Sequence, residues 1–485
     1  MEIKTKLKEI VGGERLFDAP EILESYSKDF SMTPPGKPVC VVQAKGTQEV
    51  REIIKFANEK RLPVVPSSSG VHFYGTTIPK QGGIVLDLSQ MDRVLEIDEP
   101  NRKAKIEPGI TWEKLQAELK KDGYMAMMPL LPHSSRSVVT DYLEREIPVI
   151  PVFEFSEPLL SMEVVWPNGD IFRVGSASAP NYPDSLSQGA NPMGPGSLDF
   201  WRFLQGAQGT MGVVTWANIK IENRPQENKA FFIPFERIED AIEPLFRIQR
   251  LKLGYECLLL NRFNLAMILA RDLPVDFERL IDKLPPWVLI LVLAGGYRRP
   301  MEKIEYEEKA LNEVAKEFSG LSILSSLPGV PGLERRLSDM LREPWPGRVT
   351  YWKHQWKGGC ESLFFITTLD KAPRFMEAIN GVVGKYGYSS TELGCYLQPI
   401  ETARACHLEF NFFYDPGVPR DRDKIKKLYR EAAQALLEAG ALFTRPYGIL
   451  SDMVYERSAS YTSTLKVVKG ILDPNNIMCP SNLCF

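Results

Sequence analysis

A run of small residues between 66 and 75 is the segment of the sequence best suited to hold a phosphate. It reads Pro66-Ser67-Ser68-Ser69-Gly70-Val71-His72-Phe73-Tyr74-Gly75. Small side chains allow several backbone N–H groups to point at one place, and such an arrangement binds anions, above all a pyrophosphate. The run matches neither GxxxxGK[ST] nor GxGxxG, and a serine-rich surface turn has the same composition. We therefore expect an anion site here, with a surface turn as the alternative.

Histidine and cysteine, the usual ligands of zinc and of iron–sulfur clusters, are sparse. The chain has four histidines and seven cysteines, no pair of histidines with helical metal-ligand spacing, and no CxxC or CxxCH. We therefore expect no metal site. His407 belongs to a segment that reads as a strand, where His407, Glu409 and Asn411 would share one face by the period of two.

The elements around the small-residue run predict a βαβ-like beginning. Apolar runs at 39–42 and 62–65 predict two strands. Between them Val50, Ile53, Ile54 and Ala57 form a one-sided apolar stripe, which predicts a helix capped by Thr47. Further elements expected before residue 225 are strands at 84–87, 94–97 and 104–107, a helix capped by Thr111, and short strands alternating with turns over 160–222.

Longer helices alternate with strands from about residue 225 onward. The predicted strands are 231–235, 257–261, 287–294, 362–368, 393–398 and 407–414. The predicted helices are 238–251, 301–318, 372–386 and 423–438, the last of them ended by Gly440. This order predicts a separate α+β unit built on a mainly antiparallel sheet.

Charge and hydropathy exclude several classes of protein. Lys and Arg total 59 and Asp and Glu total 62, so the net charge of −3 offers no basic surface for nucleic acid. The most apolar stretch, 287–294, is far shorter than a bilayer-spanning helix, and residues 1–17 lack the apolar core of a secretory signal. We therefore expect a soluble, cytoplasmic protein with no membrane span.

Five segments occur in an order that is informative as a whole. They are Pro63–Gly75, Gly82–Met91, Ile106–Trp112, Gly206–Thr215 and Leu472–Met478. Together they resemble the FAD-binding oxidoreductases of the vanillyl-alcohol oxidase and 4-cresol dehydrogenase superfamily, over most of the chain. The resemblance implies an α+β protein: a two-part PCMH-type FAD-binding domain, 1–225 plus 443–485, into which an α+β cap domain with an antiparallel sheet, 226–442, is inserted.

The same resemblance implies where FAD binds. The implied cofactor-binding residues are Pro66, Ser67, Ser68, Ser69, Gly70, Val71, His72, Pro132, Ser134, Ser135, Ser137, Val138, Asp141, Gly209, Gly212, Val213, Val214, Arg445 and Asn482. The segment 132–143 keeps the family's length but has serines in place of its glycines. Backbone therefore approaches the diphosphate less freely there, while Ser134, Ser135 and Ser137 can still donate hydrogen bonds.

Three residues are implied to contact the substrate. The run from Glu144-Arg145 to Met162 is similar to the Asp-Arg … Gly-Met-Glu-Val-Val run of the vanillyl-alcohol oxidase branch, which places Glu144 on that branch's acid near flavin N5. Arg445 lies where the branch has an arginine that binds the substrate phenolate, although the tyrosine before it is Thr444 here. Tyr74 matches a second phenolate-binding tyrosine. A permanently charged guanidinium suits an anionic oxygen in a closed site.

His407 has three open interpretations. The resemblance implies that a histidine near this place can carry FAD through a covalent bond. His407 could instead contact the substrate or satisfy a carbonyl at a strand edge. Glu409, on the same face, is a second candidate acid.

These residues lead to two enzyme hypotheses and one alternative of another kind. In the first, the chain takes a hydride from a benzylic or hydroxylated carbon of a para-substituted phenol or related aromatic alcohol. In the second, it is an FAD-linked 2-hydroxy-acid dehydrogenase of the glycolate or D-lactate type, with Arg445 holding the carboxylate and His407 as base. The third is a non-catalytic flavoprotein subunit. A separate electron acceptor and a homodimer or higher oligomer are further expectations.

Overall fold

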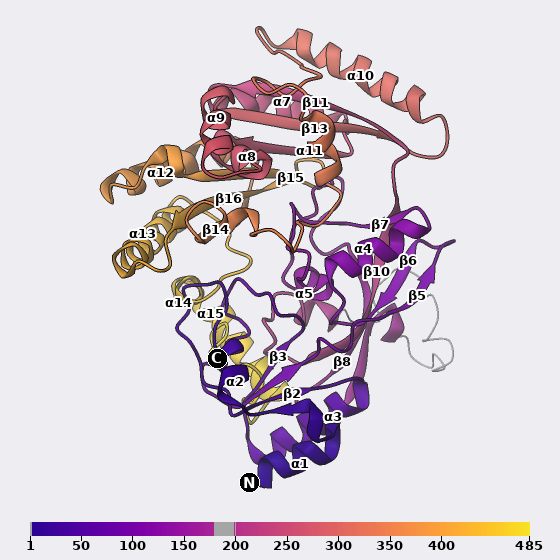
Figure 1. Ribbon diagram of the computed structural model, residues 1–485, viewed down its shortest axis with the longest axis vertical. Helices are drawn as coiled ribbons and strands as arrows, with labels where there is room; N and C mark the ends of the chain where they lie inside the picture. Colours follow the sequence, from indigo (N-terminus) through magenta and orange to yellow (C-terminus); the bar gives the residue numbers. More distant parts are fainter. Residues whose placement is uncertain (1, 179–197, 199) are drawn as a thin grey trace.

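Three β-sheets organise the chain in the computed structural model, which describes residues 2–178, 198 and 200–485 (Figure 1). The first sheet has the order β1-β2-β4-β3, and β4 pairs in parallel with both β2 and β3. The helix between β2 and β3 is α3 (Thr47–Lys60), which buries the apolar stripe predicted for it. The predicted cap was wrong: Gly46 is the N-cap, and the Thr47 hydroxyl donates instead to Glu163 Oε1 at 3.0 Å. The strands are β1 (Leu16–Phe17), β2 (Cys40–Gln43), β3 (Val64–Ser67) and β4 (Ile84–Asp87).

The second sheet is antiparallel and has the order β5-β6-β10-β8-β9, with β7 pairing to β10. Helices α4 (Trp112–Lys121) and α5 (Val138–Leu143) share its apolar core. The hydroxyl of Thr111 accepts a hydrogen bond from the Lys114 amide at 3.4 Å, so the predicted cap of α4 is confirmed. The strands are β5 (Val94–Asp98), β6 (Lys103–Ile106), β7 (Tyr124–Ala126), β8 (Leu159–Val165), β9 (Ile171–Gly175) and β10 (Val213–Asn223).

The third sheet is also antiparallel, with the order β11-β13-β12-β15-β16-β14. One face packs against α7 (Ile238–Arg250), α10 (Pro300–Glu317), α12 (Ala372–Lys385) and α13 (Pro419–Glu438). The other packs against α8 (Arg262–Leu269), α9 (Val275–Lys283) and α11 (Glu334–Met340). The strands are β11 (Glu227–Phe235), β12 (Glu256–Asn261), β13 (Trp287–Gly295), β14 (Gly359–Thr367), β15 (Gly394–Ile400) and β16 (Ala405–Tyr414).

The predicted fold class, α+β with an antiparallel sheet in the second half, is confirmed. Helix α8 was not predicted, because every residue from Phe263 to Leu269 is buried and the sequence shows no one-sided stripe. Helix α13 begins at Pro419, four residues before the predicted start. Part of the strand-and-turn region predicted over 160–222 lies outside the described residues, at 179–197 and 199.

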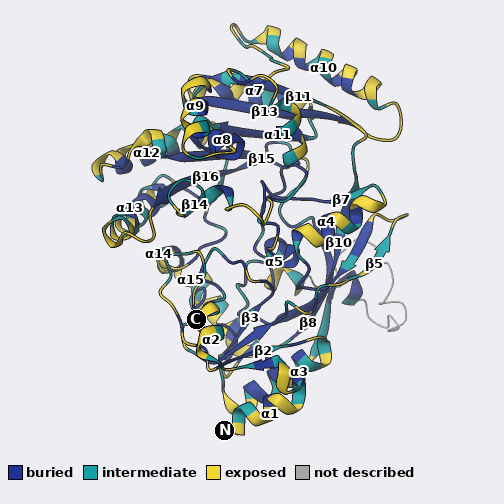
Figure 2. Ribbon diagram, in the orientation of Figure 1, coloured by how far each residue is buried: buried dark blue, intermediate teal, exposed yellow. Residues whose placement is uncertain are grey.

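After α13 the chain returns to the first two sheets through α14 (Ile449–Glu456) and α15 (Ala459–Leu472). The Val64 amide donates to Ile477 O at 2.7 Å and the Cys479 amide donates to Val64 O at 3.0 Å. Phe443 and Leu450 belong instead to the core of the third sheet. Figure 2 shows the buried strands of the two halves and the exposed outer sides of their helices. The division into 1–225 plus 443–485 and 226–442 stays a proposal.

Among residues 2–178, 198 and 200–485, no helix combines the length and the apolar character that crossing a membrane requires.

Candidate active site

The small-residue loop follows directly from β3, and its backbone is free to bind an anion. The amides of Ser69, Gly70 and Val71 donate no hydrogen bond to any described residue. The imidazole Nε2 of His72 lies 2.6 Å from Ser69 O, while its buried Nδ1 has no partner within the described chain. Burial and the nearby Arg136 lower the pKa of His72 to about 3, so this imidazole is neutral at physiological pH. Uncommitted amides beside a neutral ring fit a diphosphate.

A cavity of about 100 Å³ adjoins this loop. Seven of the residues predicted to bind the cofactor line it: Pro66, Ser68, His72, Gly209, Gly212, Val213 and Val214. Helix α5 supplies Val139, Thr140 and Leu143, and Glu144 follows at its C-terminal cap. Residues from three distant parts of the sequence thus surround one space beside free amides, and this grouping is consistent with binding of part of the predicted FAD. These residues would hold the cofactor.

Other predicted cofactor residues have different surroundings. Ser137 Oγ donates to Pro108 O at 2.6 Å and accepts from the Thr140 amide at 3.1 Å, which caps α5. Val138 packs in the core of the second sheet. Pro132 and Ser134 exchange backbone hydrogen bonds with Trp345, and Ser135 is exposed. Their contribution to cofactor binding stays a prediction.

The face of α5 that lines the cavity was missed in the sequence analysis, although the helical period predicts it. Val139 and Leu143, like Thr140 and Glu144, are four residues apart and therefore lie on one side of α5. Thr140 Oγ1 makes a hydrogen bond with Ser68 Oγ of the small-residue loop. This contact joins the two segments that line the cavity.

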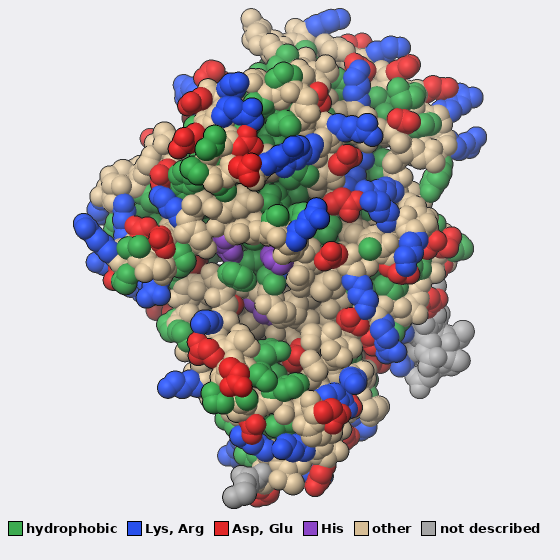
Figure 3. Space-filling view, in the orientation of Figure 1, with side chains coloured by type: hydrophobic (Ala, Val, Ile, Leu, Met, Phe, Trp, Pro, Cys, Tyr) green, Lys and Arg blue, Asp and Glu red, His purple; other side chains and the backbone are tan. Residues whose placement is uncertain are grey.

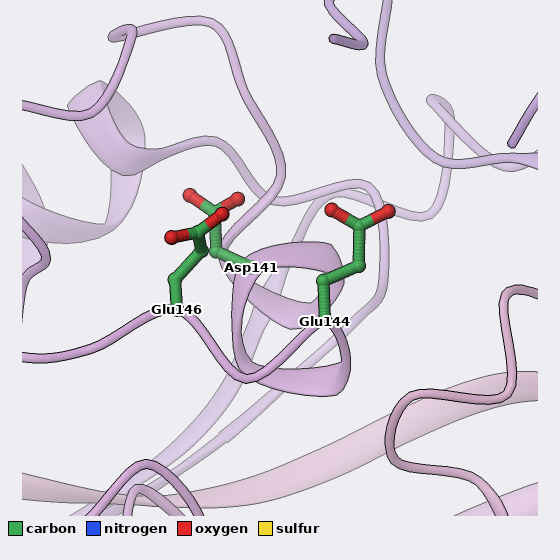
Figure 4. Close-up of side chains that lie close together, drawn as sticks. All are labelled: Asp141, Glu144 and Glu146. Atoms are coloured by element: carbon green, nitrogen blue, oxygen red, sulfur yellow. The ribbon is translucent and has the colours of Figure 1, made fainter. Parts of the chain in front are cut away.

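Three carboxylates gather at the end of α5, as Figure 4 shows. Those of Asp141, Glu144 and Glu146 lie within 4.8 Å of one another. The buried guanidinium of Arg136 forms ion pairs with both Asp141 and Glu144. An arginine therefore balances two of the three acids.

Glu144 has the environment of a base that titrates near neutral pH. Its carboxylate is buried, and it accepts a hydrogen bond from Thr76 Oγ1 at 3.4 Å. Burial raises the pKa of Glu144 to about 7, although Arg136 opposes the shift. A carboxyl with this pKa can accept and release a proton under physiological conditions.

Glu146 is a site residue that sequence reasoning did not identify. Its Oε1 accepts a hydrogen bond from Tyr74 Oη at 2.7 Å and lies 2.8 Å from Arg445 Nη1. Burial opposes ionisation, but Arg445 and Arg136 outweigh it and keep the pKa of Glu146 below its usual value. Tyr74 and Arg445, predicted to hold the substrate oxygen, therefore do come together, and an anionic oxygen of the protein lies where they meet.

Aromatic rings enclose this meeting point. Tyr74 stacks on Tyr447 with ring centroids 4.5 Å apart and planes 9° apart. The Arg445 guanidinium lies 4.1 Å from the centroid of the Phe364 ring. These residues border a cavity of about 580 Å³, whose aromatic lining is completed by Phe73, Tyr351 and Tyr429. Figure 3 shows histidine side chains close together near the middle of this face of the molecule.

The third sheet contributes a polar group from the opposite side. His407 and Glu409 lie on one face of β16, as predicted, and His407 Nε2 is 3.3 Å from Glu409 Oε2. Lys353, from the turn Trp352–His354, forms an ion pair with Glu409. Burial lowers the pKa of His407, and Lys353 holds the pKa of Glu409 far below its usual value. Tyr74, Asp141, Glu146, His407 and Glu409 all line one small cavity.

The C-terminal tail closes the cofactor side of the site. Asn482 Nδ2 donates to Thr76 O at 2.8 Å and to Gln208 O at 3.1 Å, and its Oδ1 accepts from Lys80 Nζ at 2.7 Å. Gln208 borders both the cofactor cavity and the large aromatic cavity. Asn482 therefore fixes the strip of chain between the two spaces.

Known proteins resemble this chain in sequence and in structure. The FAD binding domain family matches residues 38–175. Glycolate oxidase subunit GlcD of Bacillus subtilis is 23% identical over 99% of this chain and 96% of its own length. The 4-cresol dehydrogenase flavoprotein subunit of Pseudomonas putida is 21% identical over 98% of this chain and 94% of its own length.

Solved structures share the whole fold. The crystal structure of p-cresol methylhydroxylase with substrate bound superposes with a TM-score of 0.79 and 19% identity, covering 100% of this chain and 96% of its own. The 4-ethylphenol oxidase from Gulosibacter chungangensis gives 0.81 and 19%, covering 99% and 96%.

Fold and site together define a flavin-dependent oxidoreductase. The chain is an FAD-binding oxidoreductase with a PCMH-type fold, and FAD is its cofactor.

Proposed function

We propose that the enzyme oxidises a para-substituted phenol, or a related aromatic alcohol, at its benzylic or hydroxylated carbon. The observation that carries this proposal is the convergence of Tyr74 and Arg445, two residues that line an aromatic cavity of about 580 Å³, at one point beside it. Stacked rings suit a planar aromatic substrate. Two donors in a closed site suit its oxygen, where negative charge develops.

The location of each residue assigns its role in the proposed reaction. Arg445 and Tyr74 orient the substrate oxygen and stabilise charge on it. Glu144 borders the cofactor cavity and accepts a proton from water or from a substrate hydroxyl. FAD supplies the hydride acceptor when it is bound. The rings of Phe73, Tyr351 and Phe364 exclude water from the reacting carbon.

Substrate reduction under anaerobic conditions tests the proposal directly. We expect 4-methylphenol or 4-hydroxybenzyl alcohol to bleach the flavin absorbance of the purified protein. The methyl ether of 4-methylphenol is the matched control, because it keeps the ring and the benzylic carbon but lacks the hydroxyl that Arg445 and Tyr74 would hold. Bleaching by glycolate or D-lactate, with none by the phenols, would contradict the proposal.

A 2-hydroxy-acid dehydrogenase is the second candidate. It is supported by the similarity to glycolate oxidase subunit GlcD and by the His407–Glu409 pair, in which His407 could accept the proton of the substrate hydroxyl. In that reaction Arg445 would hold the substrate carboxylate. Glu146 weighs against it, because its own carboxylate already faces Arg445.

The pH dependence of turnover tests the role of Glu144. Since the base must be ionised and its pKa is about 7, we expect kcat/KM to rise as pH increases through that value. The Glu144→Gln variant should lose this rise and about two to four orders of magnitude in rate.

Glu361→Gln is the matched control for that experiment. Glu361 is half-buried and borders the large cavity, and its partial removal from water raises the pKa of its carboxyl to about 8. If the pH-dependent rise persists in Glu144→Gln but disappears in Glu361→Gln, Glu144 is not the base.

Several further features stay proposals. His407 has a buried Nδ1 without a partner among the described residues, so the ring is available for a covalent bond to FAD or for contact with substrate. The electron acceptor and the assembly into a homodimer or higher oligomer rest on the family resemblance.

A further inference from the structure

Glu146 occupies the place that a substrate anion would take. A single oxygen, Oε1, accepts from Tyr74 Oη at 2.7 Å and lies 2.8 Å from Arg445 Nη1. The Arg445 side chain is only 3% exposed and that of Glu146 is 18% exposed. This is the contact that a bound phenolate or carboxylate would need to make, and the protein already makes it with its own carboxylate.

The cations around this point are all paired. Arg445 pairs with Glu146, Arg136 with Asp141 and Glu144, and Lys353 with Glu409. In the part of the chain that the structure describes, each of these three cations already has a carboxylate partner, so an incoming anion would add a negative charge that no unpaired cation among them balances. The three carboxylates at the end of α5 would also lie close to it. Like charges brought together in a buried site repel strongly.

An uncharged hydroxyl meets a different environment at the same point. An ionised carboxylate only accepts hydrogen bonds, so Glu146 can receive the O–H of a phenol or alcohol but has nothing to offer a second carboxylate. Tyr74 and Arg445 can share their hydrogens with the hydroxyl oxygen. The charge balance is then kept, because a neutral molecule enters a neutral ion pair.

We propose that Glu146 is a specificity-determining residue, a built-in counter-anion through which the Arg445–Tyr74 donor pair accepts un-ionised hydroxyl compounds and rejects carboxylates. This inference deepens the proposed function, on which it rests, by naming the charge state of the substrate. Specificity here comes as much from repulsion of the wrong ligand as from attraction of the right one.

Binding of two non-reacting ligands tests the inference on the purified holoenzyme. Benzoate and benzamide have nearly the same shape, but only benzoate is charged at neutral pH, and neither has a benzylic hydrogen. Isothermal titration calorimetry gives the ratio of their dissociation constants. We expect the wild type to bind benzamide more tightly, and Glu146→Gln to shift the ratio toward benzoate by about tenfold or more. Glutamine keeps an oxygen that accepts from Tyr74, so shape is preserved.

Two variants separate charge from other effects. Glu146→Asp keeps the charge and should keep the preference for benzamide. Glu361→Gln changes a half-buried carboxyl of the large cavity, which accepts a hydrogen bond from the Met32 amide, and should leave the ratio at the wild-type value. A ratio that stays unchanged in Glu146→Gln would overturn the inference. If that variant fails to fold, tighter binding of benzoate than of benzamide by the wild type would overturn it equally.

The ligand ratio and the bleaching of flavin can fail separately, so the two experiments distinguish the role of Glu146 from the proposed reaction. Bleaching of flavin by phenols together with an unchanged ligand ratio would remove only the role of Glu146. Absence of bleaching by phenols together with the expected ratio would remove the proposed substrate and leave the preference for uncharged ligands standing.

Discussion

Replacing Arg445 by lysine is expected to lower kcat/KM for the phenolic substrate by about a hundredfold to a thousandfold, the loss typical of one preorganised donor to a developing oxyanion. The planar guanidinium lies against Phe364 and reaches Glu146 with one nitrogen, which leaves other N–H groups for the substrate oxygen. A lysine ammonium is a single point of charge. It would pair with Glu146 or with the substrate, but it cannot present a rigid fork to both.

Steady-state kinetics of Arg445→Lys, with the flavin content and melting temperature of the same preparation, check this expectation. Arg237→Lys is the matched control, because Arg237 lies on the surface and pairs only with the exposed Glu239. It should keep the wild-type kcat/KM. Unchanged turnover in Arg445→Lys would remove Arg445 from the site, whatever happens to stability.

The fold was largely predictable because its elements have strong periodic patterns. The stripe Val50, Ile53, Ile54 and Ala57 predicted α3, and all four residues are buried. The third sheet was predictable for a similar reason, since its long apolar strands alternate with amphipathic helices. Helix α8 was not, because a helix buried on every side has no polar face to set its period.

The site was predictable only where a family motif marked it. The resemblance identified Tyr74, Glu144 and Arg445, but Glu146 corresponds to no residue of that motif and was missed. Its partner Arg445 is 299 positions later in the chain, and Lys353 is 56 positions before Glu409. No local pattern encodes such pairs, because they depend on how the third sheet and the returning tail sit against the loop after β3.

Desolvated ion pairs are the contacts of the site that sequence reasoning missed. Arg136, Arg445 and Lys353 are each placed against a carboxylate from another turn or strand, and each pair is desolvated. A desolvated ion pair contributes little net stability, yet removing one partner is costly because the other charge remains buried. The network of ion pairs therefore positions the donors of the site. The free energy of unfolding that is lost when one partner is removed measures how strongly the network holds them.

Replacing Arg136 by methionine is expected to destabilise the protein by about 3–5 kcal/mol, the range for breaking a buried ion pair. Arg136 is 3% exposed and is the common partner of Asp141 and Glu144, so methionine fills the space but leaves two carboxylates buried together without a cation. The apparent melting temperature should fall by about 6 °C or more.

The loss should depend on pH in a defined direction. Without Arg136 the folded-state pKa values of Asp141 and Glu144 rise further above their unfolded values, so the folded state binds more protons than the unfolded state and stability falls as pH rises. The deficit in Arg136→Met should therefore be larger at pH 8 than at pH 5.

Neutralising the stranded acids supplies the decisive comparison for Arg136. The triple variant Arg136→Met, Asp141→Asn, Glu144→Gln keeps all three shapes but carries no charge, and it should recover most of the lost melting temperature. Arg247→Met is the exposed control, because a surface ion pair such as that of Arg247 with Glu317 contributes about 1 kcal/mol or less. If Arg136→Met costs no more than Arg247→Met, or if the triple variant recovers nothing, charge balance does not hold the end of α5 together.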